Sequence, residues 1–382
     1  FLGDPAFRVN PEDFYRRLRR VYEHLGAAEN LELFTFRGPH SYHESSRRRT
    51  YRWFLKHLMG REVDLAEVDD VDDHIETPET LAVYTKGLPA NNRSSTVHDW
   101  FVPKAAPPRI ETAEDLARER AAVAAKLRET TFSAFPSPLG DPRAAVTWEW
   151  IHREGEECAA FTFRPEGDWE LRGAIAGLRD GRAGAPVIVS LLNPDDRKGP
   201  GDALAVRGAP AGWLPAAIAT RGTDVSAWSP SLQWHLRRAA ALTGRTLASL
   251  RVLDTLQGLA AIRKLFGAGE LYLRARGEMA AVALYAALLD EATGGGVAGL
   301  ILHDPPATQN APGEPDGTGA CLEMLGCLKI TDLPQVAGLL WPAKLVFVGG
   351  RPESYLWAEE LYDRLGAPGG YWNVPALEDW RI

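Results

Sequence analysis

The stretch Leu271-Tyr272-Leu273-Arg274-Ala275-Arg276-Gly277-Glu278-Met279 joins a short apolar run to a long one. The first run, 271–274, has the length and residue types of a strand, and 279–289 has those of a helix. Only a very tight turn can connect two elements that lie so close in the chain, and Gly277 lies within that turn. The stretch therefore predicts a strand, a tight turn and a helix, the unit from which α/β sheets are built.

The same alternation continues on both sides of this stretch. Further strands are predicted at 146–151, 159–163, 187–192, 216–220, 297–302, 344–348 and 371–374, and further helices at 232–242, 250–265 and 355–365. Strands that alternate with helices are typical of a doubly wound, mostly parallel sheet. Residues 145–382 are therefore predicted to form an α/β domain.

Residues 1–60 repeat the closing unit of that domain. The segment Tyr22-Glu23-His24-Leu25-Gly26-Ala27 matches Tyr362-Asp363-Arg364-Leu365-Gly366-Ala367, and Phe1-Leu2-Gly3 matches Phe347-Val348-Gly349. In the first copy, Asn10 and Pro11 open a helix that Gly26 ends, a strand is predicted at 31–36, and a further helix at 44–59. Both copies thus predict a strand, a loop, a helix, a Gly-Ala turn and a strand.

Residues 61–144 are predicted to connect the two parts. They contain the acidic run Asp69, Asp70, Asp72, Asp73, His74 and Glu76, which lacks the spacing and the glycine of a Ca²⁺ loop and indicates a solvated linker. A short strand is expected at 81–85. Thr112, with Asp115 at the capping-box position, predicts a charged helix that runs to about Arg128.

The repeated unit resembles the closing part of an α/β-hydrolase domain, where the catalytic acid follows the penultimate strand and the catalytic histidine the last. In the first copy, Asp4 and His40 occupy these places, within Gly3-Asp4-Pro5 and Gly38-Pro39-His40. The resemblance implies that Asp4 orients His40 and that His40 is the general base and acid, with His43 as the alternative. Residues 31–58 are similar to the acetyl xylan esterase and dienelactone hydrolase branch of this superfamily.

The serine nucleophile of that superfamily is missing from the sequence. The pattern G-x-S-x-G, which places the serine on a tight strand-to-helix turn, occurs nowhere in the 382 residues. In a hydrolase domain that ends at Leu58, the nucleophile would precede Phe1. We therefore expect the chain to be the C-terminal part of a longer protein, with the nucleophile upstream.

None of the three catalytic-triad positions of the second domain holds a catalytic residue. Gly277 stands where the serine would be, Gly350 where the acid would be, and 375–382 contain no histidine. A nucleophile elbow has strained backbone geometry, which glycine relieves once chemistry is no longer required. The second domain is therefore expected to be a degenerate hydrolase with a vacant elbow. His303 and Asp304, at the end of a strand, are interpreted as a satisfied rim pair.

Composition excludes several classes of partner. The formal net charge of −8 argues against nucleic acid, and no apolar run reaches the length of a membrane span. Cys158, Cys321 and Cys327 make neither a disulfide framework nor a metal set, and the last two are expected to be buried free thiols. No metal ion or organic cofactor is implied.

The resemblance implies a serine carboxylesterase that acts on a small-molecule or polysaccharide ester, as an acetyl xylan esterase does, and it favours a secreted or periplasmic location. The second domain is expected to contact the missing upstream domain. Two alternatives stay open: a non-catalytic carbohydrate-binding or structural module, and part of a peptidase of the prolyl oligopeptidase group. Exposed aromatic side chains around the vacant cleft would favour polysaccharide binding, and an apolar face would favour a structural role.

Overall fold

The computed structural model describes residues 11–36, 41–70, 76–151, 157–177, 184–196, 199–310 and 318–380. The chain divides into two compact units, a first unit of residues 1–93 and a second unit of residues 94–382. No helix among the described residues is long and apolar enough to cross a membrane. The three cysteines are buried free thiols, as the sequence predicts for Cys321 and Cys327.

The first unit contains helices α1 (Pro11–His24), α2 (Glu44–Met59) and the short α3 (Pro78–Leu81). The predicted helix that Pro11 opens and Gly26 ends and the predicted helix at 44–59 are confirmed. Gly26, with φ 67°, follows α1, and Gly60, with φ 64°, caps α2. None of the residues of α1 and α2 is buried, so these helices have no core of their own among the described residues.

Two strand predictions in the first unit are wrong. Residues 31–36 are not in a strand, although Leu31 has the extended angles φ −130° and ψ 121°. An extended segment becomes a strand only when a neighbour pairs with its backbone, and the described residues of this unit contain no such neighbour. The predicted strand at 81–85 is also absent, because Pro78 begins a helical turn that ends at Leu81 and Thr77 caps it.

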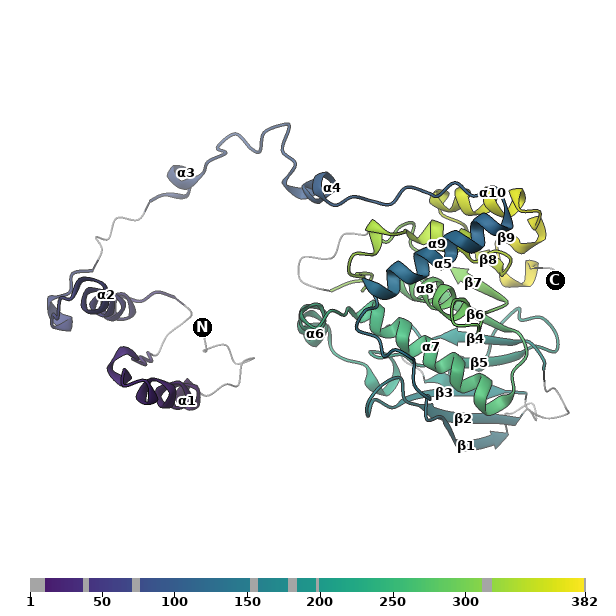
Figure 1. The fold of residues 1–382 in the computed structure, drawn as a ribbon, viewed down its shortest axis with the longest axis horizontal. Coiled ribbons are helices and arrows are strands. Elements are labelled where there is room, and N and C mark those ends of the chain that lie inside the picture. The colour runs from purple at the N-terminus through teal and green to yellow at the C-terminus, as the bar shows by residue number, and fades with distance from the viewer. Residues whose placement is uncertain are drawn as a thin grey trace. The chain divides into compact units, whose positions relative to one another are not determined.

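The second unit is built on one mixed sheet. In the described residues its strands follow the order β1-β2-β3-β5-β4-β6-β7-β8-β9 (Figure 1). They are β1 (Ala145–Ile151), β2 (Glu157–Phe163), β3 (Leu171–Ala176), β4 (Val187–Leu191), β5 (Leu214–Ile218), β6 (Leu271–Arg276), β7 (Gly299–His303), β8 (Lys344–Val348) and β9 (Tyr371–Val374). Strands β1, β2 and β3 are antiparallel, β3 runs antiparallel to β5, and the remaining pairs are parallel. The predicted α/β class with a mostly parallel sheet is confirmed.

Strand β3 was not predicted from the sequence. Its Gly173 weakens the strand pattern, because glycine has no side chain to pack and lowers strand propensity. The structure explains the residue: a Cβ at Gly173 would lie 2.2 Å from Cζ of Phe161 on the neighbouring strand β2. The glycine thus makes room for an aromatic ring across the sheet.

Helices of the second unit cover one face of the sheet. The helices of this unit are α4 (His98–Phe101), α5 (Ala113–Glu129), α6 (Pro230–Leu242), α7 (Leu247–Phe266), α8 (Glu278–Glu291), α9 (Leu333–Leu339) and α10 (Leu356–Arg364). The short α4, whose Trp100 and Phe101 are exposed, is not part of this cover (Figure 1). Helices α7 and α8 lie against the sheet, and the main apolar core forms between them and side chains such as Leu273 and Leu300 (Figure 1). Helix α9 was not predicted; it is short and begins at the Asp332 capping box with Pro334 in its first turn.

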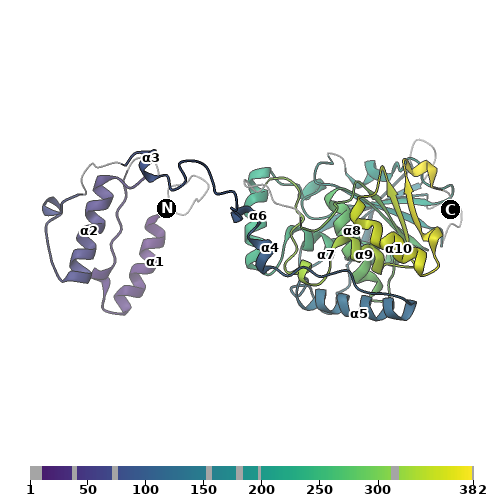
Figure 2. The same ribbon diagram turned by 90° about the horizontal axis from the view of Figure 1, so that it is seen from above.

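Helix α5 belongs to the second unit, which corrects the predicted connector of 61–144. Leu116 and Leu127 of α5 are fully buried in the main core. The guanidinium of Arg120 donates to the carbonyl of Trp341 at 3.0 Å, and that of Arg128 to the carbonyl of Leu289 at 3.1 Å. Figure 2 shows α5 along the outer side of the helical layer. The capping box of Thr112 and Asp115 is confirmed.

The opposite face of the sheet carries a smaller apolar cluster. Ile188 of β4, Tyr272 of β6 and Ile301 of β7 form its centre, and Trp213 and Trp380 cover it. Side chains two residues further along a strand point to the same face. The next positions on these three strands therefore place Ser190, Arg274 and His303 above the cluster, at the carboxyl ends of the strands.

Candidate functional site

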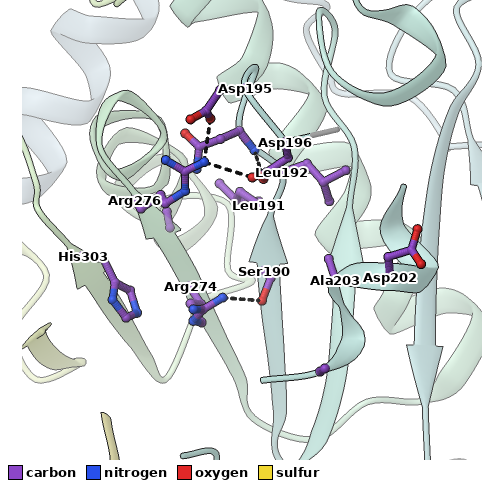
Figure 3. A pocket seen from close by; sticks show the side chains of 13 residues that line it. Ser190, Leu191, Leu192, Asp195, Asp196, Asp202, Ala203, Arg274, Arg276 and His303 are labelled. Carbon is purple, nitrogen blue, oxygen red and sulfur yellow. Dashed lines mark hydrogen bonds and ion pairs between the residues drawn. The ribbon is translucent and has the colours of Figure 1, made fainter. Parts of the chain in front are cut away.

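The site lies where the order of the strands reverses. Strand β4 has β5 on one side and β6 on the other, so the connections that leave the carboxyl ends of β4 and β6 run in opposite directions. A parallel sheet opens a crevice for ligands at such a point. A cavity of about 450 Å³ lies there (Figure 3). It is lined by Ser190, Leu191, Leu192, Asn193, Asp195, Asp196, Asp202, Ala203, Ala205, Arg274, Ala275, Arg276 and His303.

A row of polar side chains crosses three adjacent strands at the floor of this cavity. Figure 3 shows Ser190 of β4, Arg274 of β6 and His303 of β7 side by side. Ser190 is paired in register with Arg274, and Nη1 of Arg274 lies 3.5 Å from the Ser190 hydroxyl. Nε of Arg274 is buried without a hydrogen-bond partner. Burial lowers the pKa of this guanidinium, and Arg276 lowers it further while Asp196 opposes the shift.

His303 is the second unpaired polar group of the row. Its Nε2 is buried and has no hydrogen-bond partner. Burial lowers the pKa of His303 to about 4, assisted by Arg274 and Arg276 and opposed by Asp304. The imidazole is therefore neutral at pH 7. The interpretation of His303 and Asp304 as a satisfied rim pair is wrong, because no hydrogen bond joins these side chains and Nε2 is left unpaired.

The mouth of the cavity is held by an ion-pair cluster. Arg276 binds Asp195 at 2.5 Å and Asp196 at 2.9 Å (Figure 3). The other carboxylate oxygen of Asp196 accepts the backbone N–H of Asn193 at 2.7 Å, which fixes the loop after β4. These contacts raise the pKa of Arg276, mainly through the hydrogen bond to Asp195. The sequence interpretation did not select any of these residues, since they come from strands and loops far apart in the chain.

Gly277 forms the turn between β6 and α8, with φ 52° and ψ −129°. Its N–H donates to the carbonyl of His303 at 3.0 Å, and its carbonyl accepts the N–H of Ala280 at 3.0 Å. A Cβ at this position would have no atom within 4 Å. The turn thus has space for a side chain, and only its backbone angles favour glycine.

The other predicted triad positions of the second unit carry no acid and no histidine. Gly350 follows β8 with φ 135°, and residues 375–380 follow β9 without a histidine. Asp4 and His40 lie outside the described residues. His43 precedes α2 in the first unit, where its ring packs on Phe36 with centroids 4.7 Å apart.

A buried network of ion pairs and hydrogen bonds lies next to the turn at Gly277. Arg251, fully buried, binds Glu278 at 2.6 Å, directly after Gly277. Its Nε donates to the carbonyl of Arg221 at 3.1 Å, and Arg221 pairs with the fully buried Asp254 at 2.7 Å. Burial opposes the charge of Arg221, but Asp254 and Glu166 outweigh it and raise the pKa of the guanidinium. These groups join β5, α7 and α8 into one rigid base.

Comparisons with known proteins identify the fold. No protein-family model matches the chain. No curated protein matches it either. A candidate acetyl xylan esterase from Bacteroides fragilis superposes with a TM-score of 0.57 at 12% identity, over 71% of this chain and 77% of that one.

Two further solved structures are more distant. An acetyl xylan esterase from Thermoanaerobacterium sp. has a TM-score of 0.44 at 13% identity, over 72% of this chain and 90% of that one. A glucuronoyl esterase from Teredinibacter turnerae has a TM-score of 0.47 at 14% identity, over 85% and 88%. The sheet order, the tight turn after β6 and the Bacteroides structure agree, and the predicted α/β-hydrolase-like fold is confirmed.

Proposed function

We propose that this chain is part of a serine carboxylesterase that acts on carbohydrate esters, and that its second unit is a non-catalytic hydrolase-like module. The turn at Gly277 is the main observation in favour of a non-catalytic second unit. It has the strand-to-helix position and the positive φ that a nucleophile elbow requires, with free space above it, but no side chain. Gly350 stands at the predicted acid position after β8, where the next carboxylate in the chain is Glu353, and no histidine follows β9 among the described residues 375–380.

The catalytic half of the proposal rests on residues 1–60. Asp4 and His40 follow one another in the order that the α/β-hydrolase fold uses for its acid and histidine. In the proposed mechanism Asp4 holds the imidazole tautomer, and His40 deprotonates a serine that lies outside these residues and then protonates the leaving alcohol. The likeness in fold to the Bacteroides protein supports an ester of carbohydrate as substrate.

The first experiment tests the second unit with a serine-reactive probe. The purified chain is treated with a fluorophosphonate and assayed with nitrophenyl acetate, alongside Gly277→Ser and His40→Ala. We expect no stoichiometric label and equal background rates in all three, because a nucleophile without its acid and base retains only slow chemistry. Stoichiometric labelling of a serine in the unaltered chain would contradict the proposal.

A second experiment tests the role of His40 in the longer protein that the proposal requires. That protein should take up one fluorophosphonate and should lose ester hydrolysis in the variant His40→Ala. His43→Ala is the matched control, since it removes a histidine three positions away from the same segment. Full activity of His40→Ala together with loss in His43→Ala would move the catalytic role to His43.

Binding of polysaccharide by stacking is less well supported. Among the residues that the structure describes, no Phe, Tyr or Trp lines the cavity at β4, β6 and β7. The exposed Trp148, on β1, and Trp169, between β2 and β3, are not among its lining residues. The cavity is polar and suits a small polar ligand better than the flat face of a sugar chain.

A further inference from the structure

We propose that the cavity at the ends of β4, β6 and β7 binds a small hydroxylated carboxylate, with its carboxylate group at Arg274, Ser190 and His303. Binding of such a ligand does not depend on the esterase activity proposed above. It assigns a ligand to the cavity beside the vacant turn at Gly277.

Arg274 is a half-buried cation that has no carboxylate as an ion-pair partner in the described structure. Its only hydrogen bond in the described structure is the long contact to the Ser190 hydroxyl, and Nε has none. Comparable guanidinium groups of the same unit are matched: Arg251 with Glu278 at 2.6 Å, Arg221 with Asp254 at 2.7 Å and Arg263 with Asp290 at 2.7 Å. A charge withdrawn from water without a partner destabilises the fold. An anionic ligand would supply the missing partner and accept two parallel N–H bonds.

The neighbours of Arg274 suit the same group. Ser190 is only 4% exposed, and its hydroxyl faces the guanidinium from β4. His303, on the other side, presents a buried Nε2 without a partner. Since the imidazole is neutral, it donates one N–H when the proton lies on Nε2. Three polar groups from three adjacent strands thus lie side by side on the cavity floor (Figure 3).

The charges at the rim of the cavity limit which other groups the ligand can carry. Asp195 and Asp196 share Arg276, and Asp202 lines the same cavity, so the rim carries more negative than positive charge. Carboxylates accept hydrogen bonds from hydroxyl groups but repel a second negative charge. A singly charged acid with several hydroxyls therefore fits, and a dianion does not. The volume of about 450 Å³ suits a molecule of monosaccharide size.

The test uses D-glucuronate as the probe and measures binding by calorimetry and by the thermal midpoint of the full chain. Acetate supplies the carboxylate without hydroxyls, glucose supplies hydroxyls without charge, and inorganic phosphate supplies a dianion. We expect glucuronate to bind at least 10-fold more tightly than any of the three. Equal binding of glucose would overturn the proposal, as would tighter binding of phosphate or no binding of glucuronate.

Two variants locate the interaction. Arg274→Met is expected to weaken glucuronate binding at least 10-fold and, without ligand, to keep or raise the thermal midpoint, because it removes an unpaired charge. Arg164→Met is the matched control, since Arg164 is a partly exposed arginine that pairs with Glu170 and does not line the cavity. Unchanged glucuronate binding in Arg274→Met would refute the site, and a lowered midpoint would assign Arg274 a structural role instead. Ser190→Ala provides a milder second variant, with a several-fold loss of binding.

Discussion

Replacement of Gly277 by alanine or serine isolates the backbone geometry of the turn between β6 and α8. At φ 52° and ψ −129° an L-residue places its Cβ against its own backbone, whatever the surroundings allow. The surroundings contribute nothing, because no atom lies within 4 Å of a Cβ built there. The whole cost therefore arises from the two dihedral angles.

The expected loss in the free energy of unfolding follows from the kind of backbone strain at Gly277. Sparsely populated backbone angles cost about 1–3 kcal/mol per residue, and this turn, far from the ordinary left-handed region, belongs in the upper half of that range. We expect Gly277→Ala and Gly277→Ser to lower the free energy of unfolding by about 2–3 kcal/mol. For the second unit, which spans 94–382, each kcal/mol lowers Tm by about 2 °C.

Gly267 provides the matched control. It ends α7 with φ 54° and ψ 39°, the ordinary left-handed conformation, and a Cβ there would also have no atom within 4 Å. Gly267→Ala should cost about 1 kcal/mol, at the low end of the left-handed penalty. The two variants share φ and the absence of neighbours, so their difference reports the unusual ψ of the turn.

The assay is urea unfolding followed by tryptophan fluorescence, with the slope of the transition compared between variants. A Gly277→Ala variant that is neutral, or that costs no more than Gly267→Ala, would refute the assignment of elbow geometry. It would also remove the main support for a degenerate hydrolase. Restored esterase activity in Gly277→Ser would refute the proposal from the opposite side.

Three further predictions concern buried groups. Asp254→Ala should lower the unfolding free energy by about 3–5 kcal/mol, measured by urea unfolding, because it leaves Arg221 buried beside Glu166 alone; a loss below about 1 kcal/mol would contradict the network. Leu127→Ala should cost about 2–5 kcal/mol if α5 is part of the core, and almost nothing if 61–144 were a free connector. Because the pKa of His303 is lowered to about 4, the unfolded chain takes up this proton first. Stability should therefore fall as the pH drops from about 6.5 to about 4, and His303→Asn should flatten that part of the profile; an unchanged profile would contradict the shift.

Local patterns in the sequence determined most of the helices and the parallel strands. The apolar run before Gly277, the tight turn and the helix after it are adjacent in the chain, so their spacing alone limits the backbone. The capping box of Thr112 and Asp115 likewise predicts the start of α5, because its bonds join residues three positions apart.

Tertiary structure alone decided the features that depend on distant partners. Residues 31–36 have a strand-like pattern, but pairing of their backbone requires a neighbour that the described part of the first unit does not contain. Strand β3 tolerates Gly173 because Phe161 fills the space beside it, and α5 packs against the second unit through Leu116 and Leu127. Each outcome depends on residues that the local pattern does not include.

The candidate binding cavity shows the same division. Ser190 and Arg274 look unremarkable in sequence, as polar residues within apolar strands, and His303 stands out only through its neighbour Asp304. They become a site because the sheet order places β4, β6 and β7 side by side, and because the register sets the three side chains on one face. The sequence by itself determined which segments are strands. The sheet decided which of their ends meet, because strand order and register are set by packing across the whole unit.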